Sequence, residues 1–434
     1  MRLTTLTLIG GLLGGAFSVL FPGGNASAEE VMAGFPPAPA TQVTRANYLA
    51  SPFNQWSLRN ASAPLHVVMV PRGGNLWHFG RDEERLANYR TASGEGLAQL
   101  FGRNAADGVL VVRGTRILLE AYFGGMQASD QHLWFSMTKS LTSALLGPLV
   151  TTGQIDLGAS PADYIPELAG TAFERVTVQQ VLDHTTALAF KENYTDPDSD
   201  FAQHYAPALG MMYQPGAADV LPGQTEVFGV HDFLVKFVEP DQTLQPGKAF
   251  AYNSANADVL GWLVSRTTDR PLNTLIADLI WRHVGAEHDA FIAVDRAMMP
   301  VATGGFNATL RDAGRFALLI RDGGVFNDQR LLPEEWLESM LAIDAQDRRN
   351  MAENPVYASL PWVAYKNMWW VLDDDRGEFC AVGIHGQVIY IDRASDTIMV
   401  WYSSQSDASA AIAPDFGIKL DAARALARFL GEES

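Results

Sequence analysis

Cysteine, positive charge and long apolar runs are all scarce in this chain of 434 residues. Its single cysteine, Cys380, cannot form an internal disulfide, and its apolar neighbours predict buried packing instead of thiol chemistry. The 31 lysines and arginines face 49 aspartates and glutamates, a net charge of −18, which argues against nucleic acid or an anionic membrane surface as a partner. The nine histidines contain no His-x-x-x-His pair, so no metal site is predicted, and no cofactor is expected.

The first 28 residues differ from the rest of the chain. Arg2 is followed by the apolar and small residues 3–20, and Ala26-Ser27-Ala28 fits a small-x-small cleavage pattern. This order is typical of a secretory signal peptide over residues 1–28, cleaved after Ala28. Beyond it, no apolar run approaches the roughly 18 residues of a membrane span. We therefore expect a periplasmic or secreted protein with no membrane span in the mature chain, and the sequence leaves its oligomeric state open.

Hydrophobic periodicity predicts an α+β chain with helices before, inside and after a set of mostly antiparallel strands. A hairpin is expected over residues 107–123, and strands over 368–372, 379–384, 387–391 and 397–402. Helical patterns occur at 177–184, 230–238, 255–267, 272–284, 309–322, 333–342 and 418–430. The two groups of strands could share one sheet. We predict an extended N-terminal arm (29–60), an α/β sheet domain (61–150 and 290–434) and a mostly helical domain (151–289).

The most informative segment is Ser136-Met137-Thr138-Lys139, at the start of an apolar helix that should end near Gly153. Residues three apart share one helical face, so the Ser136 hydroxyl and the Lys139 amine can meet. A serine becomes a good nucleophile when a neighbouring base takes its proton, and a helix N-terminus favours a developing anion. Lys139 is the only one of the six lysines with a serine three residues before it. By itself this motif also occurs by chance.

Two further segments could complete a serine hydrolase site. Tyr252 lies just before a helical pattern, where a lysine nearby could hold the phenol partly ionised; the alternative is an ordinary, partly buried tyrosine. The segment 381–387 carries glycines at 383 and 386 inside a strand pattern. Such glycines often mark a close backbone approach, which suits a backbone N–H that binds an acyl oxygen. A bulge or a hairpin end is the simpler reading.

Taken in this order, the three elements resemble the penicillin-recognising serine hydrolases, which include class C β-lactamases, DD-peptidases and related esterases. The resemblance covers roughly residues 100–430 and extends to the segments GQIDLGASPADYIPEL, VTVQQVLDHTTAL and GGFNATLRDAGRF. Within this superfamily the chain most resembles the 6-aminohexanoate-dimer hydrolase branch, in GIHGQ, in the YNS motif at Tyr252 and in ENYTDPDSD. The resemblance implies a β-lactamase/transpeptidase-like fold, with an antiparallel sheet flanked by helices and a mostly helical second domain.

The resemblance also implies roles for individual residues. Ser136 would form an acyl-enzyme, Lys139 would share or relay its proton, and Tyr252 would serve as partner base and then protonate the leaving group. The backbone N–H groups of Ser136 and Ile384 would form the oxyanion hole, although a second register would use Gln387 instead. His184 is expected to be structural. Candidate substrate-binding residues are Tyr194, Asn253, Tyr365, Trp370, Gly383 and His385, and Trp369 is a weaker one.

Two departures from the β-lactamase pattern bear on the substrate. Ala381 and Val382 stand where β-lactamases have the lysine and threonine of Lys-Thr-Gly, and Ser254 stands where they have asparagine. The sequence therefore favours a secreted esterase or linear amidase that acts on a small ester or amide. A β-lactamase or DD-peptidase is the alternative within the class, and a non-catalytic binding or sensor domain is the alternative outside it.

Overall fold

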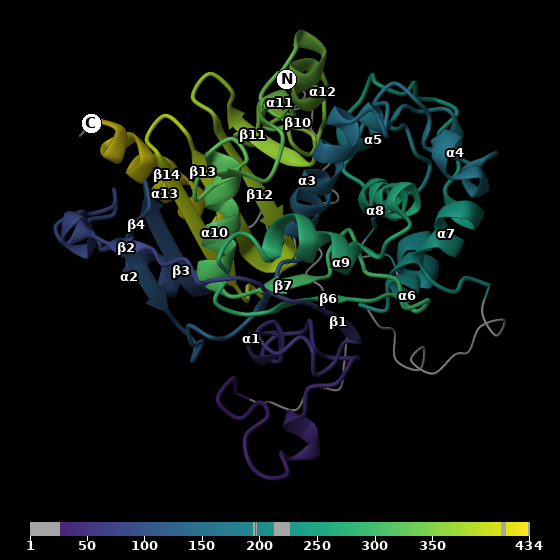
Figure 1. The fold of residues 1–434 in the computed structure, drawn as a ribbon. Coiled ribbons are helices and arrows are strands. Elements are labelled where there is room, and N and C mark those ends of the chain that lie inside the picture. The colour runs from purple at the N-terminus through teal and green to yellow at the C-terminus, as the bar shows by residue number, and fades with distance from the viewer. Residues whose placement is uncertain (1–26, 194–195, 197, 212–225, 409–413, 433–434) are drawn as a thin grey trace, which may run out of the picture.

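The computed structural model describes residues 27–193, 196, 198–211, 226–408 and 414–432. It confirms an α+β fold, and its centre is an eight-stranded sheet that is antiparallel except at the β2–β4 pair (Figure 1). In spatial order the strands are β10 (Ala364–Lys366), β11 (Trp369–Asp373), β12 (Glu378–Gly383), β13 (Gln387–Asp392), β14 (Thr397–Ser403), β3 (Ala106–Arg113), β4 (Arg116–Tyr122) and β2 (Gly80–Arg81).

The two groups of strands predicted far apart in the sequence do share this sheet. β14 pairs with β3 in antiparallel register, with Ile398 opposite Val112 and Val400 opposite Leu110. All four of these side chains are buried, because helices cover both faces of the sheet and leave no polar outer face. This pairing is what brings the last third of the chain against its first third.

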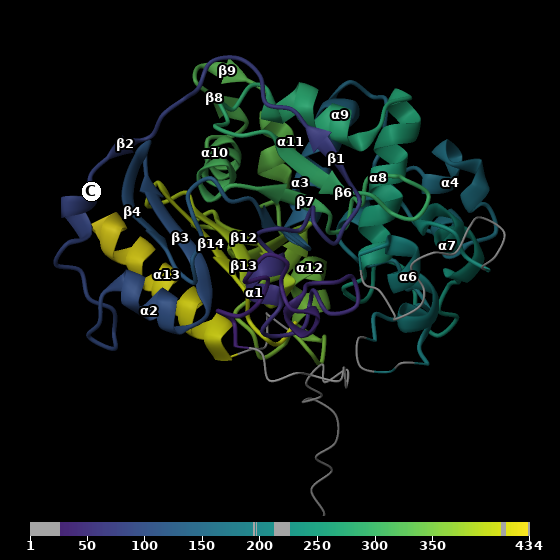
Figure 2. The same ribbon diagram turned by 90° about the horizontal axis from the view of Figure 1, so that it is seen from below.

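Figure 2 shows the helices on the two faces of the sheet. α10 (Leu310–Arg321) and α3 (Met137–Thr151) pack on one face, and α2 (Leu97–Arg103) and α13 (Pro414–Glu432) pack on the other. α13 was expected over 418–430 and begins one turn earlier. In the part of the chain that the structure describes, no helix is both long enough and apolar enough to cross a membrane.

A second sheet of four short strands was not predicted. It consists of β1 (Val67–Val70), β6 (Ala290–Ala293), β7 (Phe306–Ala308) and β5 (His132–Leu133), in that spatial order. Strands of two to four residues are too short to show an alternating pattern, so periodicity could not reveal them. β5 ends three residues before Ser136 and so fixes where α3 begins.

The described residues between 151 and 289 form helices and connecting loops beside the sheets (Figure 1). Their α-helices are α4 (Pro161–Tyr164), α5 (Val178–Leu182), α6 (Ala206–Leu209), α7 (Val230–Phe237), α8 (Ser254–Thr268) and α9 (Leu272–Ile276). Short 3₁₀ helices lie at η3 (Pro166–Leu168) and η4 (Ala172–Glu174), and π-helical turns at η5 (Phe201–Tyr205) and η6 (Ala277–Trp281). The long helix expected over 272–284 is therefore α9 continued by a π-helical turn.

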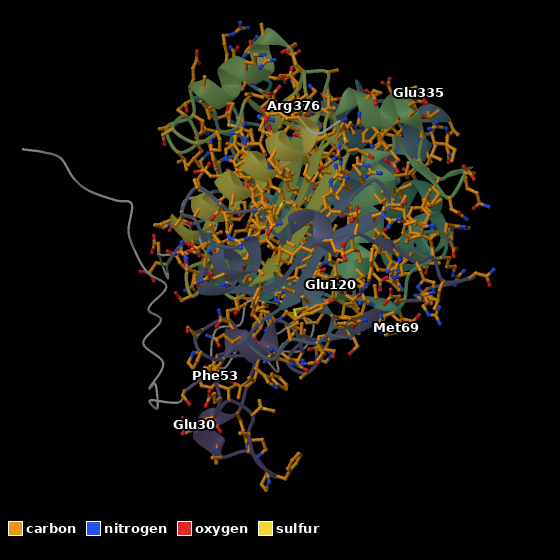
Figure 3. All side chains as sticks on the ribbon, turned by 90° about the vertical axis from the view of Figure 1, so that its left-hand side faces the viewer. Glu30, Phe53, Met69, Glu120, Glu335 and Arg376 are labelled. Atoms are coloured by element: carbon orange, nitrogen blue, oxygen red, sulfur yellow. The ribbon has the colours of Figure 1, made fainter. Side chains whose placement is uncertain are left out.

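The segment 29–60 was expected to be extended, and this was wrong. It consists mainly of turns, with the short helices η1 (Pro39–Thr41) and α1 (Asn54–Ser57). Figure 3 shows Glu30 and Phe53 on this segment, which projects from the main body. Its last part is anchored, because the buried Asn54 amide donates hydrogen bonds to the carbonyls of Ser404 (3.1 Å) and Gln405 (3.0 Å).

The remaining elements are peripheral to the two sheets. They are η2 (Glu83–Leu86), the β8 (Val325–Phe326) and β9 (Gln329–Arg330) hairpin, α11 (Glu334–Ser339) and α12 (Ala345–Ala352). The short turn η7 (Ile384–Gly386) instead joins β12 to β13 within the large sheet.

One contact sets the distance between the eight-stranded sheet and the start of α3. A Cβ atom placed on Gly383, the last residue of β12, would overlap the carbonyl oxygen of Trp134. The backbone angles of Gly383 (φ −121°, ψ 151°) suit any residue, so space and not backbone conformation requires the glycine. The sequence suggested a close approach by a ligand here, and the structure shows an approach by the chain itself.

We predict that Gly383→Ala destabilises the fold by about 1–3 kcal/mol, because the added methyl group forces the strand and the Trp134 turn apart. Urea unfolding measured by circular dichroism tests this as a lower midpoint at unchanged slope. Gly96→Ala is the control, since no atom lies near its added Cβ and its φ is −69°. An unchanged midpoint for Gly383→Ala would contradict the close approach.

Candidate active site

Ser136 lies at the N-terminus of α3, immediately after a strained turn. Phe135 has a φ of +46°, which is uncommon for a residue other than glycine and is typical of functional turns held by their surroundings. The turn is fixed on both sides: the Trp134 N–H donates to the Phe306 carbonyl (2.8 Å), and the Trp134 indole donates to the Tyr402 hydroxyl (2.8 Å). The serine hydroxyl is therefore presented at the positive end of a buried helix.

The predicted pairing of Ser136 with Lys139 is present. The Lys139 Nζ donates to the Ser136 Oγ (2.7 Å) and to the carbonyl oxygen of Thr303 (3.1 Å). Lys139 is 1% exposed, and its burial lowers its pKa from the usual value, since water no longer solvates the ammonium. A neutral amine at this position can accept the serine proton.

Tyr252 lies beside this pair, two residues before α8. The Lys139 Nζ is 5.1 Å from the centre of its ring, and its phenol forms a hydrogen bond with Ser136 that acts on its pKa. The expectation of a partly ionised phenol was wrong. Burial raises the pKa of Tyr252 well above its usual value and outweighs the Ser136 hydrogen bond, which lowers it. The resting phenol is therefore neutral and can donate a proton.

His184 packs against Tyr252 and binds the backbone next to it, which agrees with the structural role expected from the sequence. The N–H of Asn253 donates to its Nδ1 (3.0 Å), and its Nε2 faces the sulfur of Met368 (3.1 Å). Its ring packs 4.9 Å from the ring of Tyr252. Burial, followed by the Lys139 charge, lowers the pKa of His184 well below its usual value, so the neutral ring accepts the backbone hydrogen bond permanently.

The two N–H groups expected to bind an acyl oxygen lie on either side of the close approach described above. Ser136 is the N-cap of α3, and Ile384 directly follows Gly383. Neither N–H donates a hydrogen bond to a backbone carbonyl of the described residues. Ile384 was expected on the strand, but β12 ends at Gly383, and Ile384 begins the η7 turn, in which His385 (φ +59°) and Gly386 (φ +90°) reverse the chain.

Two predicted substrate-binding residues, Tyr365 and Trp370, form an aromatic wall with Tyr252. The Trp370 ring stacks on Tyr252 at 5.5 Å between centres, and Tyr365 meets it edge-on at 5.8 Å. Tyr357, which sequence reasoning missed, contacts Trp370 at 5.2 Å. This wall makes the surroundings of Tyr252 apolar on one side. Trp369 points elsewhere and packs on Phe379.

The other predicted substrate-binding residues have different surroundings. The Asn253 side chain caps α8 by accepting from the Ala255 N–H (3.1 Å), and it also donates to the Phe190 carbonyl (2.8 Å), so both ends of its amide are occupied. His385 is buried, and its Nδ1 lies 2.6 Å from the Gln405 carbonyl. Tyr194 lies outside the described residues.

Two acidic residues near the site were missed. Glu192 is partly buried, accepts from the Ser254 N–H and acts electrostatically on both Lys139 and Tyr252. Asp258 is buried one turn further along α8 and also acts on Lys139. The available signal for Asp258 was a lone carboxylate in an otherwise apolar helical stretch, which seldom occurs without a partner.

Comparison with known proteins agrees with this geometry. The model of the Beta-lactamase family matches residues 96–422, which include every element of the site. The chain belongs to the beta-lactamase family. It is a hydrolase of this superfamily, as predicted, and the matched region runs from α2 to α13.

Among relatives of this beta-lactamase-family hydrolase is the 6-aminohexanoate-dimer hydrolase of Paenarthrobacter ureafaciens. The two are 31% identical over 400 residues, which cover 90% of this chain and 96% of the relative. A solved structure from Bacillus anthracis, assigned as a 6-aminohexanoate-dimer hydrolase, has a TM-score of 0.77 at 25% identity, covering 90% of this chain and 98% of its own. A family VIII carboxylesterase shares the fold, with a TM-score of 0.51 at 15% identity, covering 76% and 96%.

We predict that Tyr252 stays protonated at pH 10, since burial raises its pKa. Ultraviolet difference spectra of the wild type and Tyr252→Phe, recorded from pH 7 to 11, should show no phenolate signal from Tyr252 below pH 10. A signal that appears below pH 9 would contradict a neutral resting phenol.

We predict that His184→Ala lowers the rate of serine acylation by about tenfold or more, because an acceptor that orients Tyr252 is lost. His184→Asn keeps an acceptor near the Asn253 N–H and should recover part of the rate. Stopped-flow measurements give the acylation rates of the two variants. Thermal unfolding shows whether a slower variant is still folded, so that a misplaced Tyr252 can be told from a loss of structure. Equal loss in the two variants at unchanged stability would count against the positioning role.

Proposed function

We propose that this protein is a serine hydrolase that cleaves linear amides and small esters through an acyl-enzyme on Ser136. The observation that carries the proposal is the 2.7 Å hydrogen bond from Lys139 to the Ser136 hydroxyl, with the partly buried phenol of Tyr252 beside the pair. A pure binding domain has no need of a nucleophile, a base of lowered pKa and a neutral acid in one place.

The proton transfers follow from the pKa directions. Neutral Lys139 takes the Ser136 proton while Oγ forms a bond to the substrate carbonyl carbon, and the carbonyl oxygen becomes an anion that the N–H groups of Ser136 and Ile384 bind. The intermediate then expels the leaving group. Tyr252 gives its phenolic proton to the leaving nitrogen or oxygen and regains one from the Lys139 ammonium. In deacylation, water replaces the leaving group: it gives up a proton as it attacks the acyl carbon, and the bond to Ser136 Oγ breaks as Oγ regains its proton from Lys139.

The preference for linear amides rests on the surroundings of the nucleophile. Ala381 and Val382 replace the lysine and threonine of the β-lactamase strand, and both are buried apolar side chains, so this strand offers no cation to a β-lactam carboxylate. The aromatic wall of Tyr365 and Trp370, each 4% exposed, makes the surroundings of Tyr252 apolar. The relative from Paenarthrobacter ureafaciens is a 6-aminohexanoate-dimer hydrolase, which makes such a linear amide the first substrate to test.

We predict that Ser136→Ala abolishes acylation, and that Lys139→Ala and Tyr252→Phe each lower kcat/KM on the order of 10²-fold or more, as expected for lost proton transfer. Hydrolysis of a p-nitrophenyl ester of a short acid and of the linear aminohexanoate dimer, followed by intact mass, measures both the rate and the acyl-enzyme. Full activity of Tyr252→Phe would remove the phenol from the mechanism.

A panel of substrates separates the alternatives. Turnover of the dimer with little turnover of a chromogenic cephalosporin supports the amidase, whereas rapid cephalosporin hydrolysis would support a β-lactamase. No turnover of any substrate, with Ser136→Ala indistinguishable from the wild type, would leave only a binding or sensor role.

We also propose that the protein is exported, on the basis of the signal-like residues 1–28. N-terminal sequencing of the mature protein from the native host should begin at Glu29, and a periplasmic or extracellular fraction should contain the activity. An uncleaved N-terminus in the cytoplasm would contradict this.

A further inference from the structure

A small cavity adjoins the segment whose next residue, Thr303, binds Lys139. It is lined by α7, by α8 and by residues 299–302, and its volume is about 20 Å³, which suffices for a single water molecule. The next residue in the chain, Thr303, supplies the carbonyl that binds Lys139 Nζ. One wall of the cavity is thus continuous with the lysine's own hydrogen-bond acceptor.

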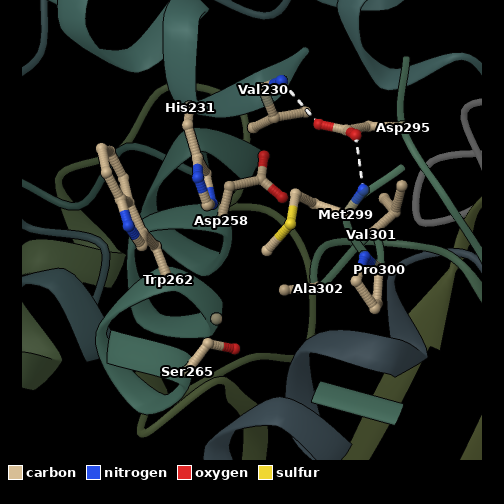
Figure 4. Close-up of a pocket in the computed structure, with 11 residues that line it drawn as sticks. Val230, His231, Asp258, Trp262, Ser265, Asp295, Met299, Pro300, Val301 and Ala302 are labelled. Carbon is tan, nitrogen blue, oxygen red and sulfur yellow. Dashed lines mark hydrogen bonds between the residues drawn. The ribbon is translucent and has the colours of Figure 1, made fainter. Parts of the chain in front are cut away.

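Two carboxylates face this cavity, and their surroundings differ (Figure 4). Asp295 accepts the N–H groups of Val230 and Met299, both at 2.8 Å, so it caps α7 and closes a turn. Asp258 accepts a 2.5 Å hydrogen bond from the buried Tyr205 hydroxyl and no backbone N–H among the described residues. Asp295 therefore holds the backbone of α7 and of a turn in place, whereas Asp258 binds no backbone group among the described residues.

The charge of Lys139 needs compensation. Its amine donates to two neutral oxygens, those of Ser136 and Thr303, and an ammonium that is 1% exposed is costly without a negative charge nearby. Two carboxylates act on it electrostatically: Glu192, which is partly exposed, and Asp258, which is 4% exposed. The buried carboxylate is screened less by water and salt.

We propose that Asp258 is the buried counter-ion of Lys139, a positioning residue that keeps the lysine basic enough to take the Ser136 proton. α3 and α8 pack against each other, so the same helix that carries Tyr252 at its entrance carries the counter-ion one turn inside. This inference rests on the proposed function, since it concerns the base of that reaction.

The surroundings of Asp258 act on its pKa in opposite directions. Burial has the largest effect and raises the pKa, and the charges of Asp295 and Glu192 raise it further, whereas the Tyr205 hydrogen bond and the Lys139 charge lower it. His231, at the cavity wall, is neutral above pH 5 because burial lowers its pKa to about 4. A negative Asp258 raises the pKa of Lys139 against the lowering that burial causes.

The test is Asp258→Asn, a change of charge with little change of shape. The rate of acylation falls at low pH as Lys139 becomes protonated, and this fall is the acid limb of the pH profile. Without the carboxylate the ammonium is less stable, so the midpoint of the acid limb should move to a lower pH by about one unit. The plateau rate should fall about tenfold, since a weaker base takes the proton. A fluorophosphonate that labels serine, followed by intact mass from pH 5 to 10, measures the limb without a natural substrate.

A second measurement reports on Lys139 directly. The chain has six lysines, so Lys139 can be assigned in ¹³C-lysine NMR spectra with Lys139→Arg, and its titration should move in Asp258→Asn by the same amount as the acid limb. Asp258→Glu should restore most of the wild-type limb, and Tyr205→Phe should give a smaller shift in the direction of Asp258→Asn.

Ser265→Ala is the matched control, because Ser265 lines the same cavity without a charge, and its limb should equal that of the wild type. An unshifted limb and an unshifted Lys139 titration in Asp258→Asn would overturn the inference, whatever happens to the plateau. Failure of the proposed function is distinguishable, since wild-type Ser136 would then remain unlabelled at every pH.

Discussion

The arrangement of the site depends on the burial of one amine. In the proposed mechanism Lys139 acts as a base because burial lowers its pKa. Burying a lysine is unfavourable unless its N–H groups find hydrogen-bond partners. Ser136 and Thr303 provide those partners. Other buried polar groups of α3 also have hydrogen-bond partners. The Ser140 and Thr142 hydroxyls donate to carbonyls of neighbouring segments.

The same constraint explains why the site lies where the two sheets and the helical region meet. β5 delivers the chain to Ser136 through the Phe135 turn, β12 ends against Trp134 at Gly383, and α8 closes the third side. A single sheet could not surround the amine, because one of its faces would remain open on that side. Three elements from distant parts of the chain exclude water from it together.

Local signals predicted many of these elements well. The helical patterns at 255–267 and 309–322 correspond to α8 and α10, and the structure adds their N-caps, Asn253 and Thr309. The long strands β12 to β14 were predicted within one residue at each end. The four-stranded sheet escaped prediction because its strands are short, and the segment 29–60 was misjudged because proline and alanine allow turns as readily as extended chain.

The sequence by itself determined the type of chemistry. A serine and a lysine one helical turn apart, a tyrosine before a helix and a glycine-bearing strand are local facts that need no folded structure. Only the tertiary structure decided the ionisation of these groups. Burial makes Tyr252 a neutral acid and Lys139 a weaker base, and it brings Asp258 to the lysine from a helix more than a hundred residues away. Desolvation and charge pairing depend on everything that surrounds a group, and no local pattern encodes those surroundings.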